Sequence, residues 1–167
     1  RATLAVRLCA SVAVADAVLF VNALQGEMFT FDIATGGKIG NIKFLGKDAS
    51  TSPLVLGNDV IAAFAGDKNA SLVSYDISIG KTNWIKNYGD IQTSPVMKDG
   101  FVYFGNLRGF QYRIDITSGK KIWKYNSGSP IHSTCAAAEG FLIFGNDKGK
   151  ISCLSADDGK EVWKIET

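Results

Sequence analysis

The sequence predicts an all-β protein built from four copies of one antiparallel unit, and three observations carry this prediction. A tight turn that contains glycine recurs at intervals of about 40 residues, and a fixed period of this size is typical of repeat architectures. The sequence contains 18 glycines but only 3 prolines, which suits many short strands joined by tight turns. No stretch shows the pattern of a helix. The four turn glycines are Gly36, Gly80, Gly119 and Gly159.

The third copy shows the unit most clearly. Short, mostly apolar strands are predicted at residues 93–97, 101–105, 110–114 and 121–125, with turns between them. Four short antiparallel strands in about 40 residues are typical of one blade of a β-propeller. The sequence therefore predicts a β-propeller with four-stranded antiparallel blades, and four blades in this chain.

The four copies divide a single domain, or part of one, that spans residues 1–167. Residues 1–8 precede the first copy, and we expect them to form an outer strand of a neighbouring blade. Four blades can close a ring by themselves. They can also be half of a seven- or eight-bladed ring, as part of a longer chain or through assembly, and this larger ring is favoured. The blades span about residues 9–46, 50–88, 92–127 and 132–167.

The second and fourth strands of the copies differ in composition. The second strands, such as 101–104 and 141–144, are apolar on both faces, which indicates that neighbouring blades cover both sides. The fourth strands carry lysines, for example Lys121 and Lys124, as is common at exposed sheet edges. We therefore expect the fourth strand to lie at the outer rim of each blade.

A tryptophan follows the turn glycine by four residues in three of the copies, and Gly40 takes its place in the first. The turn glycine is expected to have a positive φ, which other residues adopt only at an energetic cost. The tryptophan ring can then lie against the adjacent blade. We expect these residues to join the blades rather than to carry chemistry. The residues assigned to this docking are Trp84, Trp123 and Trp163 with Gly36, Gly80, Gly119 and Gly159.

Composition and charge argue against several classes of function. Basic and acidic residues number 18 and 16, a net charge of +2, so no strong field favours nucleic acid. No apolar run approaches the ~20 residues of a membrane-spanning helix, so we expect no membrane insertion. The three cysteines are isolated, and with one histidine they lack the spacing of a zinc site. We expect the thiols to be buried as small apolar side chains.

The first 20 residues are apolar and include an early arginine. Arg7 and Asp16 interrupt this run and no initiating methionine is present, so no signal peptide is recognised. The bulky Leu8 before Cys9 also argues against a lipoprotein cleavage site. We expect a mature soluble protein or an excised part of one.

The repeated motif resembles that of a known family. The stretch 115–123, Asp-x-x-Ser-Gly-Lys-x-x-Trp, with Ser-Pro-Val at 94–96 and Phe-Gly-Asn at 104–106, is similar to the repeat of pyrroloquinoline-quinone (PQQ)-like propellers. Related repeats occur in quinoprotein alcohol dehydrogenases and in the bacterial outer-membrane assembly scaffold BamB. The likeness covers about residues 9–167. It implies that the tryptophans pack between adjacent blades and that the protein is extracytoplasmic, in the periplasm or cell envelope.

The marks of the enzymes in this family are not found in the sequence. Their adjacent-cysteine disulfide has no counterpart, since the nearest cysteines are Cys135 and Cys153, and no Glu/Asn/Asp cluster can be assigned as their calcium site. The resemblance therefore favours a non-catalytic scaffold without a cofactor, which binds a protein partner and further blades from the same or another chain. A fragment of a PQQ-dependent alcohol or sugar dehydrogenase, with PQQ and calcium, is the alternative. A WD-type interaction propeller is a second alternative, weakened by the absence of Trp-Asp strand endings.

Candidate contact residues for a protein partner lie where the copies differ, in the loops between strands and the links between blades. No catalytic, cofactor-binding or metal-binding residue is predicted. His132 is the only histidine, and a structural role is favoured for it over a catalytic one. The candidate residues are Asp67, Lys68, Asn69, Asp90, Asn106, Arg108, His132, Asn146 and Lys148.

Overall fold

The computed structural model describes residues 10–24, 26–44, 49, 51–65 and 71–166, whose regular structure is entirely β-strand. The first sheet contains β1 (Ala13–Ala15), β2 (Val18–Ala23), β3 (Glu27–Asp32) and β4 (Lys38–Lys43). The second contains β5 (Leu54–Leu56), β6 (Asp59–Ala63), β7 (Leu72–Asp76) and β8 (Lys81–Lys86). The third contains β9 (Val96–Lys98), β10 (Phe101–Gly105), β11 (Phe110–Asp115) and β12 (Lys121–Asn126). The fourth contains β13 (Ala136–Ala138), β14 (Phe141–Gly145), β15 (Lys150–Ser155) and β16 (Glu161–Glu166).

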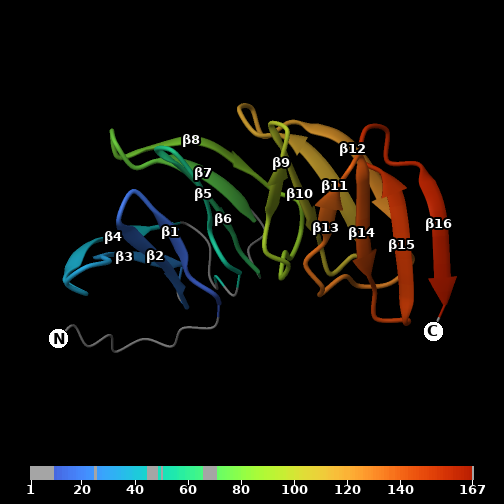
Figure 1. The fold of residues 1–167 in the computed structure, drawn as a ribbon, viewed down its shortest axis with the longest axis horizontal. Helices are drawn as coiled ribbons and strands as arrows, with labels where there is room; N and C mark the ends of the chain where they lie inside the picture. Colours follow the sequence, from blue (N-terminus) through green and yellow to red (C-terminus); the bar gives the residue numbers. More distant parts are fainter. Residues whose placement is uncertain (1–9, 25, 45–48, 50, 66–70, 167) are drawn as a thin grey trace.

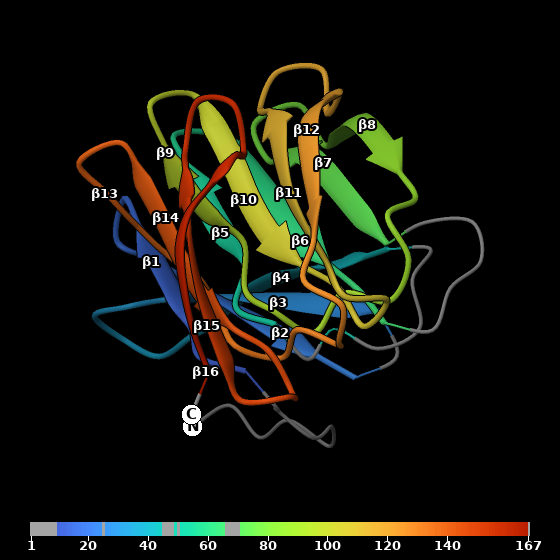
Figure 2. The same ribbon diagram turned by 90° about the vertical axis from the view of Figure 1, so that its right-hand side faces the viewer.

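Each sheet is an antiparallel meander in which consecutive strands pair, so the predicted four-stranded blades are confirmed. The lysine-bearing fourth strands β4, β8, β12 and β16 lie at the sheet edges, as expected. Figure 1 shows the sheets following one another in chain order, from β1–β4 (blue) to β13–β16 (red) at the opposite end. The view in Figure 2 shows the sheets packed face against face. This arrangement is an open array of propeller blades, with β16 at one end of it.

The turn between the third and fourth strands is closed by its own side chains. In the third sheet, Asp115 accepts hydrogen bonds from the backbone nitrogen of Ser118 at 2.8 Å and from its hydroxyl at 2.5 Å. The nitrogen of Gly119 donates to the carbonyl of Asp115 at 2.9 Å. Gly119 has a φ of 63°, in the left-handed region that favours glycine. The other three turn glycines also have positive φ, which confirms the prediction for all four copies.

The pairing of the third and fourth strands is shifted by a bulge at one equivalent place in every sheet. The residues before the shift are Thr30, Ser74, Arg113 and Cys153. A bulge re-aims the side chains beside it, and these four positions are therefore structurally comparable. The side chain at this position differs in each sheet, so the boundaries between blades contain different groups.

Apolar side chains fill the spaces between neighbouring sheets. The cluster between the second and third sheets includes Ile61, Leu72 and Phe104, and the cluster between the third and fourth includes Tyr103 and Leu142. The sequence predicted such cover on both faces of every second strand. The fourth sheet departs from this expectation, because no further blade follows it among the described residues and one face of β14 is exposed.

Near the short first strands, hydroxyl groups make bonds both within a blade and between neighbouring blades. The hydroxyl of Thr93 donates to the carbonyl of Gly105 at 3.0 Å and accepts from its nitrogen at 2.9 Å. From one blade to the next, the nitrogen of Ser52 donates to the Ser94 hydroxyl at 3.0 Å, and that of Ser94 to Thr134 at 3.1 Å. The stretches Thr51-Ser52-Pro53 and Thr93-Ser94-Pro95 thus contribute structural links between blades. Within the described ranges, the structure has no helix long and apolar enough to cross a membrane.

Candidate binding surfaces

The tryptophans of the second and third sheets dock onto the glycine turn of the next sheet. The indole nitrogen of Trp84 donates to the carbonyl of Ile116 at 3.0 Å, and that of Trp123 donates to Ala156 at 2.9 Å. A Cβ added to Gly119 would lie 2.7 Å from Cδ2 of Trp84, closer than real Cβ contacts allow. The glycine is therefore needed both for its positive φ and for the close approach of the ring.

At the two ends of the array, the equivalent docking residues meet no partner among the residues that the structure describes. Trp163 is 40% exposed, whereas Trp84 and Trp123 are 8% and 9% exposed. At the other end, a Cβ added to Gly36 would meet nothing within 4 Å. The expectation that Trp163 packs against a blade is therefore not fulfilled by the residues that the structure describes.

Trp163 belongs to a continuous apolar surface, which we call the end face. Its members are Phe141, Ile143, Ile151, Trp163 and Ile165, all exposed. The corresponding positions of the third sheet include Phe101, Tyr103 and Trp123, which pack against the fourth sheet. A shallow cavity of about 460 Å³ lies on the end face, lined by Ala138, Glu139, Phe141, Ile143, Cys153, Val162 and Trp163.

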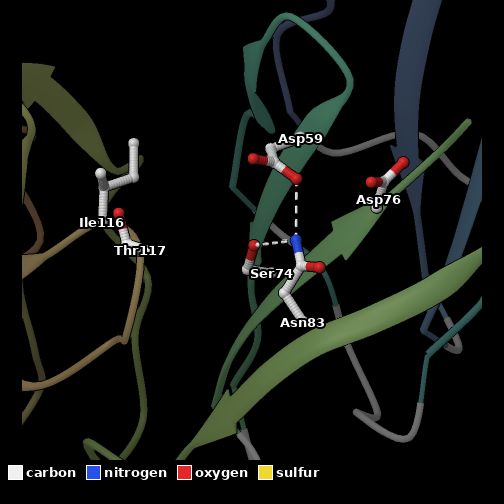
Figure 3. A pocket seen from close by; sticks show the side chains of 6 residues that line it. All are labelled: Asp59, Ser74, Asp76, Asn83, Ile116 and Thr117. Carbon is white, nitrogen blue, oxygen red and sulfur yellow. Dashed lines mark hydrogen bonds between the residues drawn. The ribbon is translucent and has the colours of Figure 1, made fainter.

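A second, polar cavity of about 350 Å³ opens between the second and third sheets (Figure 3). The side-chain nitrogen of Asn83 donates to the Asp59 carboxylate at 2.7 Å and to the Ser74 hydroxyl at 3.2 Å. Figure 3 shows Ile116 and Thr117 on the opposite side, contributed by the turn of the third sheet. We call this cavity the interblade slot. It is lined by Asp59, Ser74, Asp76, Asn83, Ile116 and Thr117.

The slot carries a carboxylate that accepts hydrogen bonds from its own turn. The hydroxyl of Ser78 donates to Asp76 at 2.6 Å, and the backbone nitrogen of Ser78 donates at 2.8 Å. These hydrogen bonds, above all that of the hydroxyl, hold the pKa of Asp76 below its usual range. Among the described residues, neither Asp59 nor Asp76 forms an ion pair.

The boundary between the third and fourth sheets has an arginine in the comparable place. Arg113 donates to the carbonyls of Ala156 and Asp157 at 2.8 and 2.7 Å. Its guanidinium lies over the ring of Phe101, with Cζ 3.6 Å from the ring centroid. Arg113 is buried, so the protein itself holds a guanidinium between two blades.

Strand register shows which residues replace these groups at the interblade slot. Ser74 replaces Arg113, because each precedes the bulge and pairs with the tryptophan of its own sheet. Asp59 replaces Phe101, because each begins the second strand of its sheet. Sequence reasoning missed the slot, although aligning the copies on their turn glycines places Ser74 opposite Arg113.

Two of the asparagines predicted as contact residues instead hold their own loops together. Asn106 is buried, and its side-chain nitrogen donates to the carbonyl of Tyr88 at 2.6 Å. Its side-chain oxygen accepts from the backbone nitrogens of Arg108 and Phe110 at 3.1 and 3.0 Å. Asn146 makes equivalent bonds in the fourth sheet. The prediction of a contact role does not fit the buried side chain of Asn106.

The remaining loop residues are not gathered into one site. Arg108, Lys148 and Asp90 are exposed. His132 is also exposed, with Nδ1 3.2 Å from Gln92 Oε1 and Nε2 3.3 Å from an oxygen of Asp147. The other candidates, Asp67, Lys68 and Asn69, lie outside the described residues.

The cysteines that the structure describes are buried, as expected, and free. Burial raises the pKa of the Cys135 thiol to about 12, so it stays protonated at neutral pH. Cys9 lies outside the described residues. In the described part of the chain, no three His, Cys, Asp or Glu side chains come together to hold a metal ion.

The chain matches the family model of outer membrane protein assembly factor BamB over residues 1–100 and 111–167. It belongs to the BamB family. No match was found among curated protein sequences. The crystal structure of BamB from Moraxella catarrhalis is 17% identical, with a TM-score of 0.79, over 95% of this chain and 53% of that chain. This member of the BamB family thus spans about half the length of that BamB structure.

Two further solved structures share the propeller fold. The computationally designed Ika4 protein is 17% identical, with a TM-score of 0.76, over 92% of this chain and 93% of that chain. A europium-containing methanol dehydrogenase is 14% identical, with a TM-score of 0.76, over 93% of this chain and 41% of that chain. Together with the family match, these structures confirm the PQQ-like propeller repeat that the sequence motif indicated.

Proposed function

We propose that this protein is a non-catalytic propeller scaffold that binds other protein chains, and that further propeller blades occupy its end face. The observation that carries the proposal is the exposure of Trp163 and the apolar side chains around it. A contiguous apolar surface of this kind marks a protein interaction site. The function of the BamB-family model, outer membrane protein assembly, supports a protein partner in the cell envelope.

The occupant of the end face can be specified from the two docked tryptophans. Each of them meets a glycine turn and a carbonyl three residues before the glycine, as Trp123 does with Gly159 and Ala156. Trp163 has the same ring and the same indole donor. Its partner is therefore a blade that presents this glycine turn, from the same or another chain.

Two of the exposed loop residues, Arg108 and Lys148, are proposed as further contact positions of the scaffold. Arg108 and Lys148 lie at equivalent turns of adjacent sheets, each supported by an asparagine that closes its loop. Two cations on neighbouring, well-supported turns suit an acidic segment of a partner. These residues are the ones to vary once a partner is known.

The experiment places a photo-crosslinking amino acid at Ile165 in the end face, with Ile122 on β12 as the matched control. Both residues are exposed on a fourth strand, but only Ile165 belongs to the end face. In a cell-envelope extract, we expect Ile165 alone to crosslink a peptide that contains a propeller glycine turn, identified by mass spectrometry. The added change Trp163→Asp should abolish that product. Equal products from the two positions, or none from Ile165, would contradict the proposal.

A second measurement addresses the non-catalytic part. The purified protein is mixed with PQQ and calcium, and quinone absorbance and alcohol-dependent dye reduction are followed. We expect neither retention of the quinone nor dye reduction. Uptake of the quinone with turnover would instead support the dehydrogenase alternative, a class that includes one structural neighbour.

A further inference from the structure

We propose that the interblade slot between the second and third sheets binds a guanidinium group, presented by an arginine side chain of a partner protein. Binding of a guanidinium group in the slot does not depend on the proposed scaffold function. Only the identification of a partner protein as the source of the arginine rests on that function. The proposal follows from one internal comparison. Two successive blade boundaries share the same bulge and the same bond from a tryptophan to a backbone carbonyl. The boundary between the third and fourth sheets is filled by Arg113, whereas the one between the second and third sheets is open.

The filled boundary shows which backbone groups receive a guanidinium. Arg113 donates to two successive carbonyls, those of Ala156 and Asp157. The corresponding carbonyls in the open slot belong to Ile116 and Thr117, which line it. Ala156 accepts from both Trp123 and Arg113, while its counterpart Ile116 accepts from Trp84. The pair of acceptors is thus repeated without the arginine.

In the open slot, a charged residue stands where the filled boundary has an aromatic ring. The guanidinium of Arg113 lies over Phe101, and Asp59 stands at that position in the open slot. The amide of Asn83 donates to one carboxylate oxygen of Asp59 and so orients the group. Asp76 adds a second carboxylate on the same sheet. A cation that enters the slot would meet charges that form no ion pair among the described residues.

The shape of the acceptor set favours arginine over lysine. Two adjacent carbonyls on one wall and a carboxylate on the other suit a planar group that donates in several directions. A lysine ammonium is a point charge and could satisfy only part of this set. The cavity of about 350 Å³ has room for the side-chain stem as well. Asp59 and Asn83 are exposed, so a side chain can enter from solvent.

The slot can be tested by NMR on the ¹⁵N-labelled protein, following the side-chain amide of Asn83 and the indole N–H of Trp84. The probe is N-acetylarginine amide, with N-acetyllysine amide for comparison. We expect saturable shifts of both signals with a dissociation constant of about 1 mM for the arginine probe, and binding about tenfold weaker for the lysine probe. Calcium chloride alone is the test for a metal in place of a guanidinium.

Three variants assign the binding to the slot. Asp59→Asn should weaken the arginine probe about tenfold, because it removes the carboxylate and keeps the shape. Ser74→Arg should abolish binding, because it fills the slot as Arg113 fills the next boundary. Asp16→Asn is the matched control and should change nothing, since Asp16 is an exposed carboxylate on a turn of the first sheet. If the Ser74→Arg protein does not fold, Asp59→Asn and Asp16→Asn still decide the result.

Several outcomes would overturn the proposal. These are an absence of saturation at tens of millimolar probe, equal binding of the arginine and lysine probes, unchanged binding in Asp59→Asn, or tighter binding of calcium at the same signals. Free arginine as a third probe distinguishes the source of the group. Tighter binding of the blocked form supports a protein side chain, whereas tighter binding of the free amino acid would overturn the protein source. Failure here leaves the end-face crosslink unaffected, so the two proposals fail separately.

Discussion

Trp123 and Trp163 occupy the same position of the same motif in neighbouring blades, yet only one is buried. Trp123 donates its indole proton to Ala156 and lies against Gly159, whereas Trp163 is 40% exposed on the end face. The motif therefore supplies a docking group, and the following blade decides whether the group contributes to stability. A similar contrast exists between two blade boundaries. Arg113 fills the boundary between the third and fourth sheets, whereas the interblade slot between the second and third sheets is open.

The largest difference is expected for removal of the two tryptophan rings. Trp123→Ala should lower the free energy of unfolding by about 3–5 kcal/mol, because it removes a buried aromatic ring from between two sheets. Trp163→Ala should cost less than about 1 kcal/mol in the isolated chain, because that residue is already 40% exposed and no described blade packs against it. Denaturant unfolding followed by circular dichroism measures both. Equal losses would contradict the assignment of Trp123 as the docked ring.

The next effect concerns the glycines that receive these rings. Gly159→Ala should cost about 2–4 kcal/mol, because the new Cβ would lie 2.7 Å from Trp123 and the residue keeps a φ of 71°. Gly36→Ala should cost only about 1–2 kcal/mol, because the conformation is the same and the space is open. Thermal or denaturant unfolding gives the comparison, and a smaller loss for Gly159 would show that its turn is not a docking surface.

Most of the fold could be predicted from the sequence because it is repeated. A single glycine or tryptophan means little, but Gly119 with Trp123 recurs in phase with its copies, and the repeat locates the strands between them. The exposure of Trp163 could not be predicted in this way, because it depends on whether a further blade packs against the fourth sheet. The motif alone gave all three tryptophans the same role.

The candidate sites were less predictable than the fold. Asn106 stands in a polar loop, but its amide is used by the loop's own backbone, which sequence does not reveal. The interblade slot was missed for a different reason. The slot is open and polar because Ser74 stands in the place of Arg113 and Asp59 in the place of Phe101. Ser74 and Asp59 come to line one cavity only through the strand bulge and the packing of two sheets.

A third prediction compares the filled and open blade boundaries. Arg113→Ala should lower the free energy of unfolding by about 1.5–3 kcal/mol, because two charge-assisted hydrogen bonds to carbonyls are lost. The contact with the Phe101 ring is lost as well. Asp59→Ala at the open boundary should change the free energy of unfolding by less than about 0.5 kcal/mol, because Asp59 is exposed. Denaturant unfolding under identical conditions tests this, and equal effects would contradict the internal comparison.

The smallest expected effect distinguishes the docking turns by their response to acid. Lys160, through its side chain and backbone, lowers the pKa of Asp158 to about 2 from an ordinary value of 3.8, with help from Ser155. In the turn onto which Trp84 docks, the aspartate and the serine have changed places: Asp115 stands where the fourth sheet has Ser155, and Ser118 stands where it has Asp158. There Ser118 lowers the pKa of Asp115. A carboxyl whose pKa is lowered by folding stabilises the protein fully above its unfolded value, and this contribution disappears as pH falls through its folded value.

For Asp158 the affected window is therefore about pH 4 to pH 2. We expect the free energy of unfolding of the wild type to fall with acid across this window, and the Asp158→Asn protein to fall less steeply. Asp99→Asn, at an exposed carboxylate in a β-turn outside the docking turns, is the control and should keep the wild-type slope. Urea unfolding at half-unit pH intervals measures the slopes. Parallel curves for all three proteins would show that the carboxylate does not stabilise the turn onto which Trp123 docks.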